Sequence, residues 1–268
     1  MSLIKPFAAV ALLCCAVSGT RWMRIAILSD IHANREAFDA VLETVRTQPP
    51  DQLVLLGDLV GYGPDPVYVV EKAADLVEDG ALCIMGNHDE AVVVGRTNMT
   101  EHARAAVEWT RERLARQHLD FLARLPLSFR SEDRFYVHAS AERPEKWLYI
   151  RDADAAERCL SSSDARFIFC GHTHIPAIYY ALPGSRPIHF SPLSNVAAPL
   201  SELRRHLIVV GAVGQPRDRN PAACFALLDT ERREVTMVRV PYDHEETARK
   251  VQASGLPAWL GMRLKIGR

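Results

Sequence analysis

The chain has 268 residues, of which 48% are hydrophobic and 24% are charged, and its formal net charge at pH 7 is -1. This is an ordinary globular composition, with enough apolar side chains for a full core. Because so small a net charge provides no long-range field to gather nucleic acid, we expect no polymeric nucleic acid as a partner.

The first 22 residues have a character of their own. Lys5 is followed by the apolar run 6–18, which ends in small residues and has the form of a signal peptide. The run is too short for a stable membrane span. The alternative is an upstream extension, because Met23 directly precedes a strand-like run and is itself a natural beginning. We favour the extension and treat residues 1–22 separately from the domain expected over residues 23–268.

The cysteines support this choice. The chain has six cysteines and no Cys-x-x-Cys pair, and three of them, Cys83, Cys170 and Cys224, lie inside apolar runs. This pattern is typical of buried free thiols in a reducing compartment rather than of a disulfide framework. We therefore predict a cytoplasmic protein, with export as the alternative if residues 1–22 act as a signal peptide.

The first part of the domain alternates strand-like and helix-like segments. The apolar run 25–28 leads into Asp30 and His32, and a helix capped by Asn34 is expected to follow and to end at Pro49-Pro50. The next run, 53–56, leads into Gly57-Asp58. A glycine-rich turn with Tyr62 then precedes a helix that begins after Asp65 and stops at Gly80.

The third apolar run, 81–85, leads into Asn87, His88 and Asp89, and we expect Asp89 to pair locally or to cap a helix. Strands separated by single helices form right-handed parallel crossovers, so these three strand ends should share one edge of a sheet. From about residue 100 to 125 the chain is expected to be one helical stretch.

Two more strand-like runs end in possible metal ligands. Residues 135–137 lead into His138, and residues 167–170 lead into His172 and His174, with a helix expected between them at 152–160. Beyond Ile188 the pattern changes to short strand-like runs, the last two of which form an antiparallel hairpin. These runs are 188–190, 207–210, 224–228 and 235–240, followed by a short helix at 245–254.

Ligands bind at the carboxyl ends of strands in an open parallel sheet, so the five sets of polar side chains should converge on one site. Asp30 and His32 are two residues apart, which on an extended backbone directs both side chains to the same side, and His172 and His174 repeat this spacing. Mixed carboxylate, imidazole and amide donors suit Mn²⁺, Fe²⁺ or Zn²⁺. The candidate ligands are Asp30, His32, Asp58, Asn87, His138, His172 and His174. These are too many for one tetrahedral ion, so we predict two divalent metal ions that share one carboxylate.

The five motifs D-x-H, G-D, G-N-H-D, a single His after a strand and G-H-x-H occur here in this order, and they resemble those of the calcineurin-like metallophosphoesterase superfamily. Segments 57–66, 171–176 and 213–218 are further similar to a bacterial phosphodiesterase-like branch, so the resemblance extends over residues 23–268. It implies an α/β fold, specifically a four-layer α/β/β/α sandwich.

The resemblance also implies roles for individual residues. The first metal would be held by Asp30, His32, Asp58 and His174, and the second by Asp58, Asn87, His138 and His172. A hydroxide between the two ions would attack phosphorus in line. His88 would lie near the leaving oxygen as general acid or charge stabiliser, and Asn87, His88, Tyr62 and Asn98 are candidate substrate contacts.

The leading hypothesis is a phosphodiesterase acting on a small phosphoester. Serine/threonine protein phosphatases, which cleave monoesters, carry an arginine after their Gly-Asp motif, whereas residues 59–63 contain none. This absence of local basic side chains favours a diester, which has one negative charge fewer. A phosphomonoesterase or a dinucleoside polyphosphate hydrolase remains an alternative. A non-catalytic protein-binding scaffold is the rival from another class, but every implied ligand is present.

Overall fold

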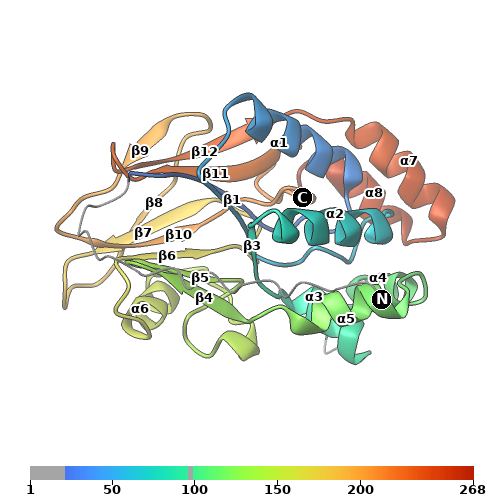
Figure 1. Cartoon of the computed structure of the whole chain (residues 1–268), viewed down its shortest axis with the longest axis horizontal. Helices are drawn as coiled ribbons and strands as arrows, with labels where there is room; N and C mark the ends of the chain where they lie inside the picture. Colours follow the sequence, from blue (N-terminus) through green and yellow to red (C-terminus); the bar gives the residue numbers. More distant parts are fainter. Residues whose placement is uncertain (1–21, 96–98) are drawn as a thin grey trace, which may run out of the picture.

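The computed structural model describes residues 22–95 and 99–268 and consists of two six-stranded mixed sheets packed face to face (Figure 1). The order of strands is β3-β2-β1-β11-β12-β9 in the first sheet and β4-β5-β6-β10-β7-β8 in the second. Helices cover both outer faces, so the predicted four-layer α/β/β/α fold is confirmed. Asn98 and the signal-like segment 1–21 lie outside the described residues.

The strands are short. Those of the first sheet are β1 (Arg24–Leu28), β2 (Gln52–Leu55), β3 (Leu82–Cys83), β9 (Ala197–Pro199), β11 (Ala223–Asp229) and β12 (Glu234–Val240). Those of the second are β4 (Ser128–Ser131), β5 (Arg134–Val137), β6 (Phe167–Cys170), β7 (Ala177–Ala181), β8 (Ile188–Phe190) and β10 (Arg205–Val209). The strands β4, β7 and β9 were not expected from the sequence.

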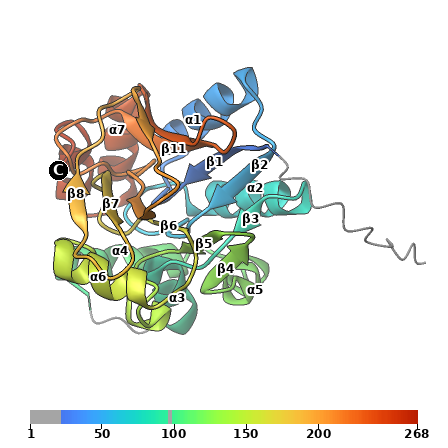
Figure 2. The ribbon, with the colours of Figure 1, turned by 90° about the vertical axis from the view of Figure 1, so that its left-hand side faces the viewer.

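The helices lie mainly in the connections between strands. They are α1 (Arg35–Thr47), α2 (Pro66–Glu78), α3 (Asn87–Val94), α4 (Glu101–Arg111), α5 (Arg116–Arg124), α6 (Ala153–Ser161), α7 (His244–Ser254) and α8 (Ala258–Leu264), with a 3₁₀ turn at Pro144–Lys146. In the turned view, α1 lies beyond the first sheet and α6 beyond the second, on opposite sides of the sandwich (Figure 2). None of the helices in the part of the chain that the structure describes is long and apolar enough to cross a membrane.

The strands β1, β2 and β3 are parallel and joined through α1 and α2, as predicted. Alternation along β1 explains how this sheet is buried on both faces. Ala26 and Leu28 pack in the cluster that contains α1 and α2, whereas Ile25 and Ile27 face the second sheet. There they meet Tyr136 of β5 and other side chains of the inner layer, so one short strand contributes to two cores.

The structure corrects one helical prediction and adds one helix. The stretch expected to be one helix from 100 to 125 is divided into α4 and α5, because Ala115 is extended and its N–H donates to Nδ1 of His118, 3.1 Å away, at the start of α5. Asn87 and His88 do not extend a strand but form the first turn of α3. The Asp89 carboxylate accepts hydrogen bonds from the N–H groups of Gly86 (3.0 Å) and Val60 (3.1 Å), which confirms its expected capping role.

The four cysteines of the described residues, Cys83, Cys159, Cys170 and Cys224, are all free and buried. This confirms the prediction that the cysteines in apolar runs are core thiols and form no disulfide framework.

Candidate active site

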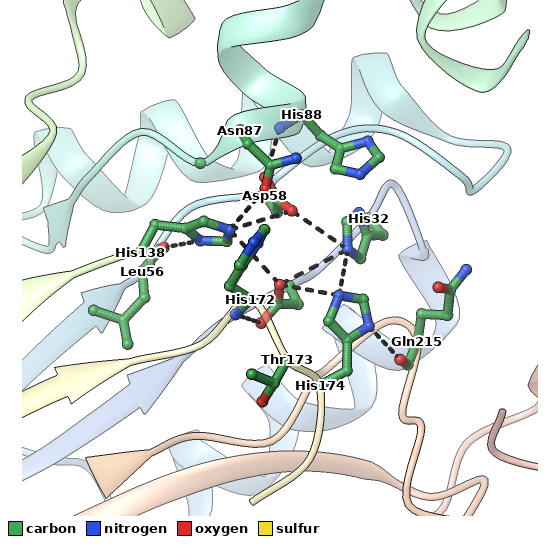
Figure 3. Close-up of polar contacts among 12 residues, drawn as sticks. His32, Leu56, Asp58, Asn87, His88, His138, His172, Thr173, His174 and Gln215 are labelled. Carbon is green, nitrogen blue, oxygen red and sulfur yellow. Dashed lines mark hydrogen bonds and ion pairs between the residues drawn. The ribbon is translucent and has the colours of Figure 1, made fainter. Parts of the chain in front are cut away.

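Five loops bring the predicted metal ligands to one place. The loops after β1, β2 and β3 belong to the first sheet, and those after β5 and β6 belong to the second. The strands β5 and β6 are parallel to each other. The expectation of one open parallel sheet is therefore wrong. The site lies at the junction of two sheets, where side chains from both layers surround a common centre (Figure 3). Burial of the aspartates and histidines is nearly complete, with 5% exposure at most.

The backbone at these loops is not extended. Asp30 and His32 have φ angles of 55° and 50°, and His172 and His174 have 65° and 61°. Asp58 also has a positive φ, of 52°. The spacing of two residues does bring Asp30 and His32 into one group of ligand atoms, but through backbone of left-handed φ instead of the alternation of a strand, whereas His172 and His174 belong to different groups. Such conformations are disfavoured for non-glycine residues and cluster at functional sites.

Two glycines allow the loops to approach one another. A Cβ atom on Gly171 would lie 1.8 Å from Oγ of Ser29 and 2.5 Å from Oδ2 of Asp30. A Cβ atom on Gly86 would lie 2.2 Å from Oδ1 of Asp58. Any side chain at either position would displace a carboxylate of the site, so the G-N-H-D and G-H-x-H motifs require glycine for close packing.

Three imidazoles are oriented by backbone carbonyls. Nδ1 of His32 lies 3.1 Å from the Val60 oxygen, and Nδ1 of His138 lies 2.7 Å from the Leu56 oxygen. Nδ1 of His174 similarly lies 2.7 Å from the Gln215 oxygen. A carbonyl oxygen can only accept, so each Nδ1 carries a proton. In the neutral rings Nε2 is then a free acceptor that faces the centre of the site, as in metal-binding histidines.

This tautomer leaves acceptor atoms facing one another. Nε2 of His32 and Nε2 of His174 are 3.1 Å apart, and Nε2 of His174 is 3.2 Å from Oδ1 of Asp30. Among the described residues no group donates a hydrogen bond to Oδ1 of Asp30 or to Nε2 of His172. Lone pairs buried at such distances repel unless a cation lies between them, so this donor set fits a bound metal ion.

The potential ligand atoms fall into two groups, within each of which all atoms lie within 4.8 Å of one another. One group is Asp30, His32, Asp58 and His174, and the other is Asp58, His138 and His172. Asp58 belongs to both. Its Oδ1 accepts from the His88 N–H at 2.8 Å, while its Oδ2 lies 3.6 Å from Nε2 of His32 and 3.4 Å from Nε2 of His138.

Asn87 lies beside the second group. Its Oδ1 is 3.2 Å from Nε2 of His138, and this amide also comes from the first turn of α3. The sequence-based set of seven side chains is thus assembled around one centre, and the sharing of Asp58 between the two groups parallels the two ligand sets that the resemblance implies.

The carboxylates and one histidine stabilise each other's charge. Burial favours the neutral acids, but interaction with the His174 and His138 imidazoles holds the pKa of Asp30 and of Asp58, respectively, below the usual value. Burial likewise opposes protonation of His138, yet Asp58 raises the pKa of that imidazole to about 9. In Asp89, burial and the nearby Asp58 charge raise the pKa to about 7.

Most other buried imidazoles are held neutral. Burial lowers the pKa of His88 to about 4 and that of His172 to about 3. It also lowers the pKa of His32 and His174. His206, outside the site, has a pKa of about 4 for the same reason. Neutral imidazoles are the form that binds metal ions.

These shifts predict how the stability of the metal-free protein depends on pH. The histidines with a lowered pKa are His32, His88, His172, His174 and His206. Below about pH 6.5 these histidines bind protons in the unfolded chain but remain neutral in the folded protein, so acidification favours unfolding. Asp89, whose pKa is raised by folding, has the opposite effect. The raised pKa of His138 stabilises the folded protein, fully below pH 6.5, and this contribution is lost as the pH rises toward 9.

We therefore expect the free energy of unfolding in EDTA to be greatest near pH 6.5 and to fall by at least about 2 kcal/mol between pH 6.5 and 5. Denaturant titrations at several pH values measure this directly. A stability that stays constant or increases on acidification would contradict the assignment of neutral buried imidazoles.

The structure adds site residues that the sequence analysis missed. The Tyr149 ring stacks on His172 with ring centres 3.9 Å apart, and Trp147 lies edge-on to His138. Arg217 donates from its backbone N–H to the His174 oxygen at 3.2 Å, and its guanidinium carbon is 5.7 Å from the centre of the Tyr62 ring. Arg217 belongs to the segment 213–218 that carried the family resemblance, whereas Tyr149 had no comparable signal.

Tyr62 lies beside the site as proposed, with its ring centre 4.7 Å from that of His32 and 4.4 Å from that of His88. The inference that no basic side chain is nearby is wrong. Residues 59–63 contain no arginine, but Arg217 reaches the same place from a loop about 150 residues further along the chain.

The fold and this buried cluster of aspartates and histidines are those of a metal-dependent hydrolase. Residues 23–233 match the calcineurin-like phosphoesterase superfamily domain, and the chain belongs to this superfamily. The protein is therefore a metal-dependent phosphoric ester hydrolase, as the motifs predicted.

Individual relatives cover nearly the whole chain. The uncharacterized protein MJ0912 of Methanocaldococcus jannaschii is 34% identical over 251 residues, 91% of this chain and 98% of the relative. Phosphodiesterase YfcE of Escherichia coli is 24% identical over 216 residues, 78% of this chain and 89% of YfcE. The crystal structure of a metallophosphoesterase from Sphaerobacter thermophilus superposes with a TM-score of 0.79 at 36% identity, covering 92% of this chain and all of that one.

Proposed function

We propose that the protein is a dinuclear metal-dependent phosphodiesterase acting on a small phosphoester. The observation that carries the proposal is the pair of Nε2 atoms of His32 and His174, 3.1 Å apart, each with its Nδ1 committed to a carbonyl. The second group of ligand atoms, which shares Asp58, supports a second ion. The donor set suits Mn²⁺, Fe²⁺ or Zn²⁺.

In this proposal the first ion is held by Asp30, His32, Asp58 and His174, and the second by Asp58, Asn87, His138 and His172. Two such ions, when bound, activate water at neutral pH and neutralise charge on the phosphoryl oxygens. Hydrolysis forms one bond from the water oxygen to phosphorus and breaks the ester P–O bond, and a proton ends on the leaving oxygen.

His88 contributes through its side chain, because its backbone N–H already holds Oδ1 of Asp58. With a pKa of about 4, which nearby cations would lower further, its imidazole is neutral at the pH of the cell. A neutral imidazole is a poor general acid but a good hydrogen-bond donor. Of the two roles expected from the sequence, we therefore favour stabilisation of charge on the reacting phosphate.

The preference for a diester now rests on the likeness to YfcE, which is named a phosphodiesterase and aligns over 78% of this chain. The absence of arginine from residues 59–63 does not support a diester, because Arg217 lies beside Tyr62. The complete set of ligand side chains at one buried centre argues against a non-catalytic scaffold.

The buried free thiols of Cys83, Cys159, Cys170 and Cys224 support a reducing compartment, so we propose the cytoplasm. The small net charge of -1 supports a small-molecule substrate over a polymeric nucleic acid.

The test is hydrolysis of a simple aryl phosphodiester and of the matching monoester by Mn²⁺-reconstituted protein, side by side. Preference for the diester, lost in Asp58→Asn, supports the proposal. Preference for the monoester would reassign the enzyme to the phosphomonoesterases. Two bound metal ions without activity on either ester would refute the phosphodiesterase assignment for simple substrates.

A further inference from the structure

A cavity of about 470 Å³ opens beside the metal-ligand cluster. Its lining includes Tyr149, Arg151, Thr173, Tyr179, His189 and Arg217. Thr173 stands between His172 and His174 in the chain, so one wall of the cavity is the loop that carries two proposed metal ligands (Figure 3). The cavity is therefore next to the site proposed for the reacting phosphate, and its Tyr149 contacts the proposed ligand His172.

Arg217, one of the residues that line the cavity, is held in place by hydrogen bonds. Its backbone N–H is bonded to the His174 oxygen, and a terminal nitrogen donates to Oε1 of Gln215 at 2.8 Å. Its Nε is buried and has no partner among the described residues. Gln215, which is 1% exposed, directs the guanidinium without neutralising it.

Arg151 is fixed by stacking. Its guanidinium carbon lies 4.2 Å from the centre of the Tyr149 ring, and that ring stacks on His172 with centres 3.9 Å apart. Two groups this close to one ring cannot share a face, so Tyr149 is sandwiched between His172 and Arg151. The cation is thus held one aromatic layer away from the cluster of metal ligands.

Neither arginine is neutralised by a carboxylate. Across residues 22–95 and 99–268, no ion pair includes Arg151 or Arg217, although many other arginines of the chain are paired. Two oriented and unpaired guanidinium groups on one cavity, next to a site for a phosphoryl group, form a receptor for a second anion.

We propose, on the basis of the proposed phosphodiesterase function, that this cavity selects substrates carrying a second phosphoryl group beside the one that reacts. The substrate class is then a phosphodiester or phosphoanhydride with a further phosphate on its substituent. Both faces of Tyr149 are occupied, so recognition comes from charge and guanidinium hydrogen bonds and not from stacking of a base on that ring.

The test compares two chromogenic diesters, 4-nitrophenyl phenyl phosphate and the same diester with a phosphonate on its phenyl ring. Release of 4-nitrophenolate by Mn²⁺-loaded protein gives kcat/KM for each. We expect the wild-type protein to prefer the phosphonate-bearing diester, and Arg217→Gln to reduce this preference about tenfold, mainly through KM. Arg151→Gln, at a more exposed position, should reduce it about threefold. Arg46→Gln on α1, which removes the same charge at a remote exposed site, is the matched control.

A wild-type preference that both substitutions leave intact would overturn the subsite while leaving the phosphodiesterase function standing. If the wild-type protein hydrolyses neither diester, the proposed function fails, and calorimetric binding of phenylphosphonate then decides on the cavity alone. Binding weakened in Arg217→Gln and Arg151→Gln but not in Arg46→Gln supports the anion subsite. Equal binding in all four proteins rejects it.

Discussion

Asp58→Asn is expected to reduce the metal content of the protein and to lower phosphodiester hydrolysis by at least about 10³-fold. Asp58 is the side chain that belongs to both groups of ligand atoms. Its Oδ1 is already committed to the His88 N–H, so Oδ2 alone faces His32 and His138. Asparagine has no charge and only one oxygen, so its NH2 group lies either toward both proposed ions or, in the other orientation of the amide, against the His88 N–H.

Metal content by elemental analysis and turnover of an aryl diester are measured on the same preparation. Asp75→Asn, an exposed aspartate on α2, removes one carboxylate at a distance from the site and should behave as the wild type does. Asp58→Asn protein that retains two ions and normal turnover would show that the shared-carboxylate assignment is wrong.

The ligand side chains could be predicted because their signal is local. A run of three to five apolar residues followed within two positions by Asp, Asn or His identifies a buried strand and the side chains at its end, as with the run before Asp30. The parallel arrangement of β1, β2 and β3 follows from the intervening helices, which are marked by the Asn34 cap and by the Pro66 start.

The division into two sheets has no such local signal. The strand β1 pairs with β11, so that Ile25 lies opposite Leu228, and a contact over about 200 residues leaves no trace in either segment. Helix α3 was missed because its later residues, Ala91 to Val94, are a continuous apolar run without helical periodicity. Its capping bond, from the Gly86 N–H to Asp89, is local, but the same carboxylate also accepts from the N–H of Val60, which belongs to another loop.

The arrangement of residues around the cavity also has no local signal in the sequence. Arg217 and Tyr62 meet only because the loops after β2 and β10 are brought together by separate sheets. The residues next to Gly57-Asp58 therefore give no indication of the guanidinium of Arg217. The chemistry at the ends of strands is encoded locally, whereas the surroundings that select a substrate depend on contacts between distant segments.

His88→Ala is expected to lower kcat about 10²-fold or more while the protein retains its full metal content. The effect on kcat and the effect on metal content are separable because the first depends on the imidazole ring of His88 and the second on its backbone N–H. The backbone N–H, which alanine keeps, holds Oδ1 of Asp58 at 2.8 Å, whereas the ring lies among Tyr62 and His32 and belongs to neither group of ligand atoms. Elemental analysis and single-turnover kinetics on one preparation test both statements, and loss of metal would make His88 a ligand.

His88→Asn distinguishes charge stabilisation from general acid catalysis. Asparagine retains an N–H donor of similar reach but cannot transfer a proton, so it should recover part of the activity lost in alanine if a neutral imidazole acts by hydrogen bonding. Because burial already lowers the pKa of His88 to about 4, removing the imidazole should not displace any kinetic pKa near neutrality. An asparagine variant as inactive as alanine, together with a lost kinetic pKa between 6 and 8, would instead identify His88 as the general acid.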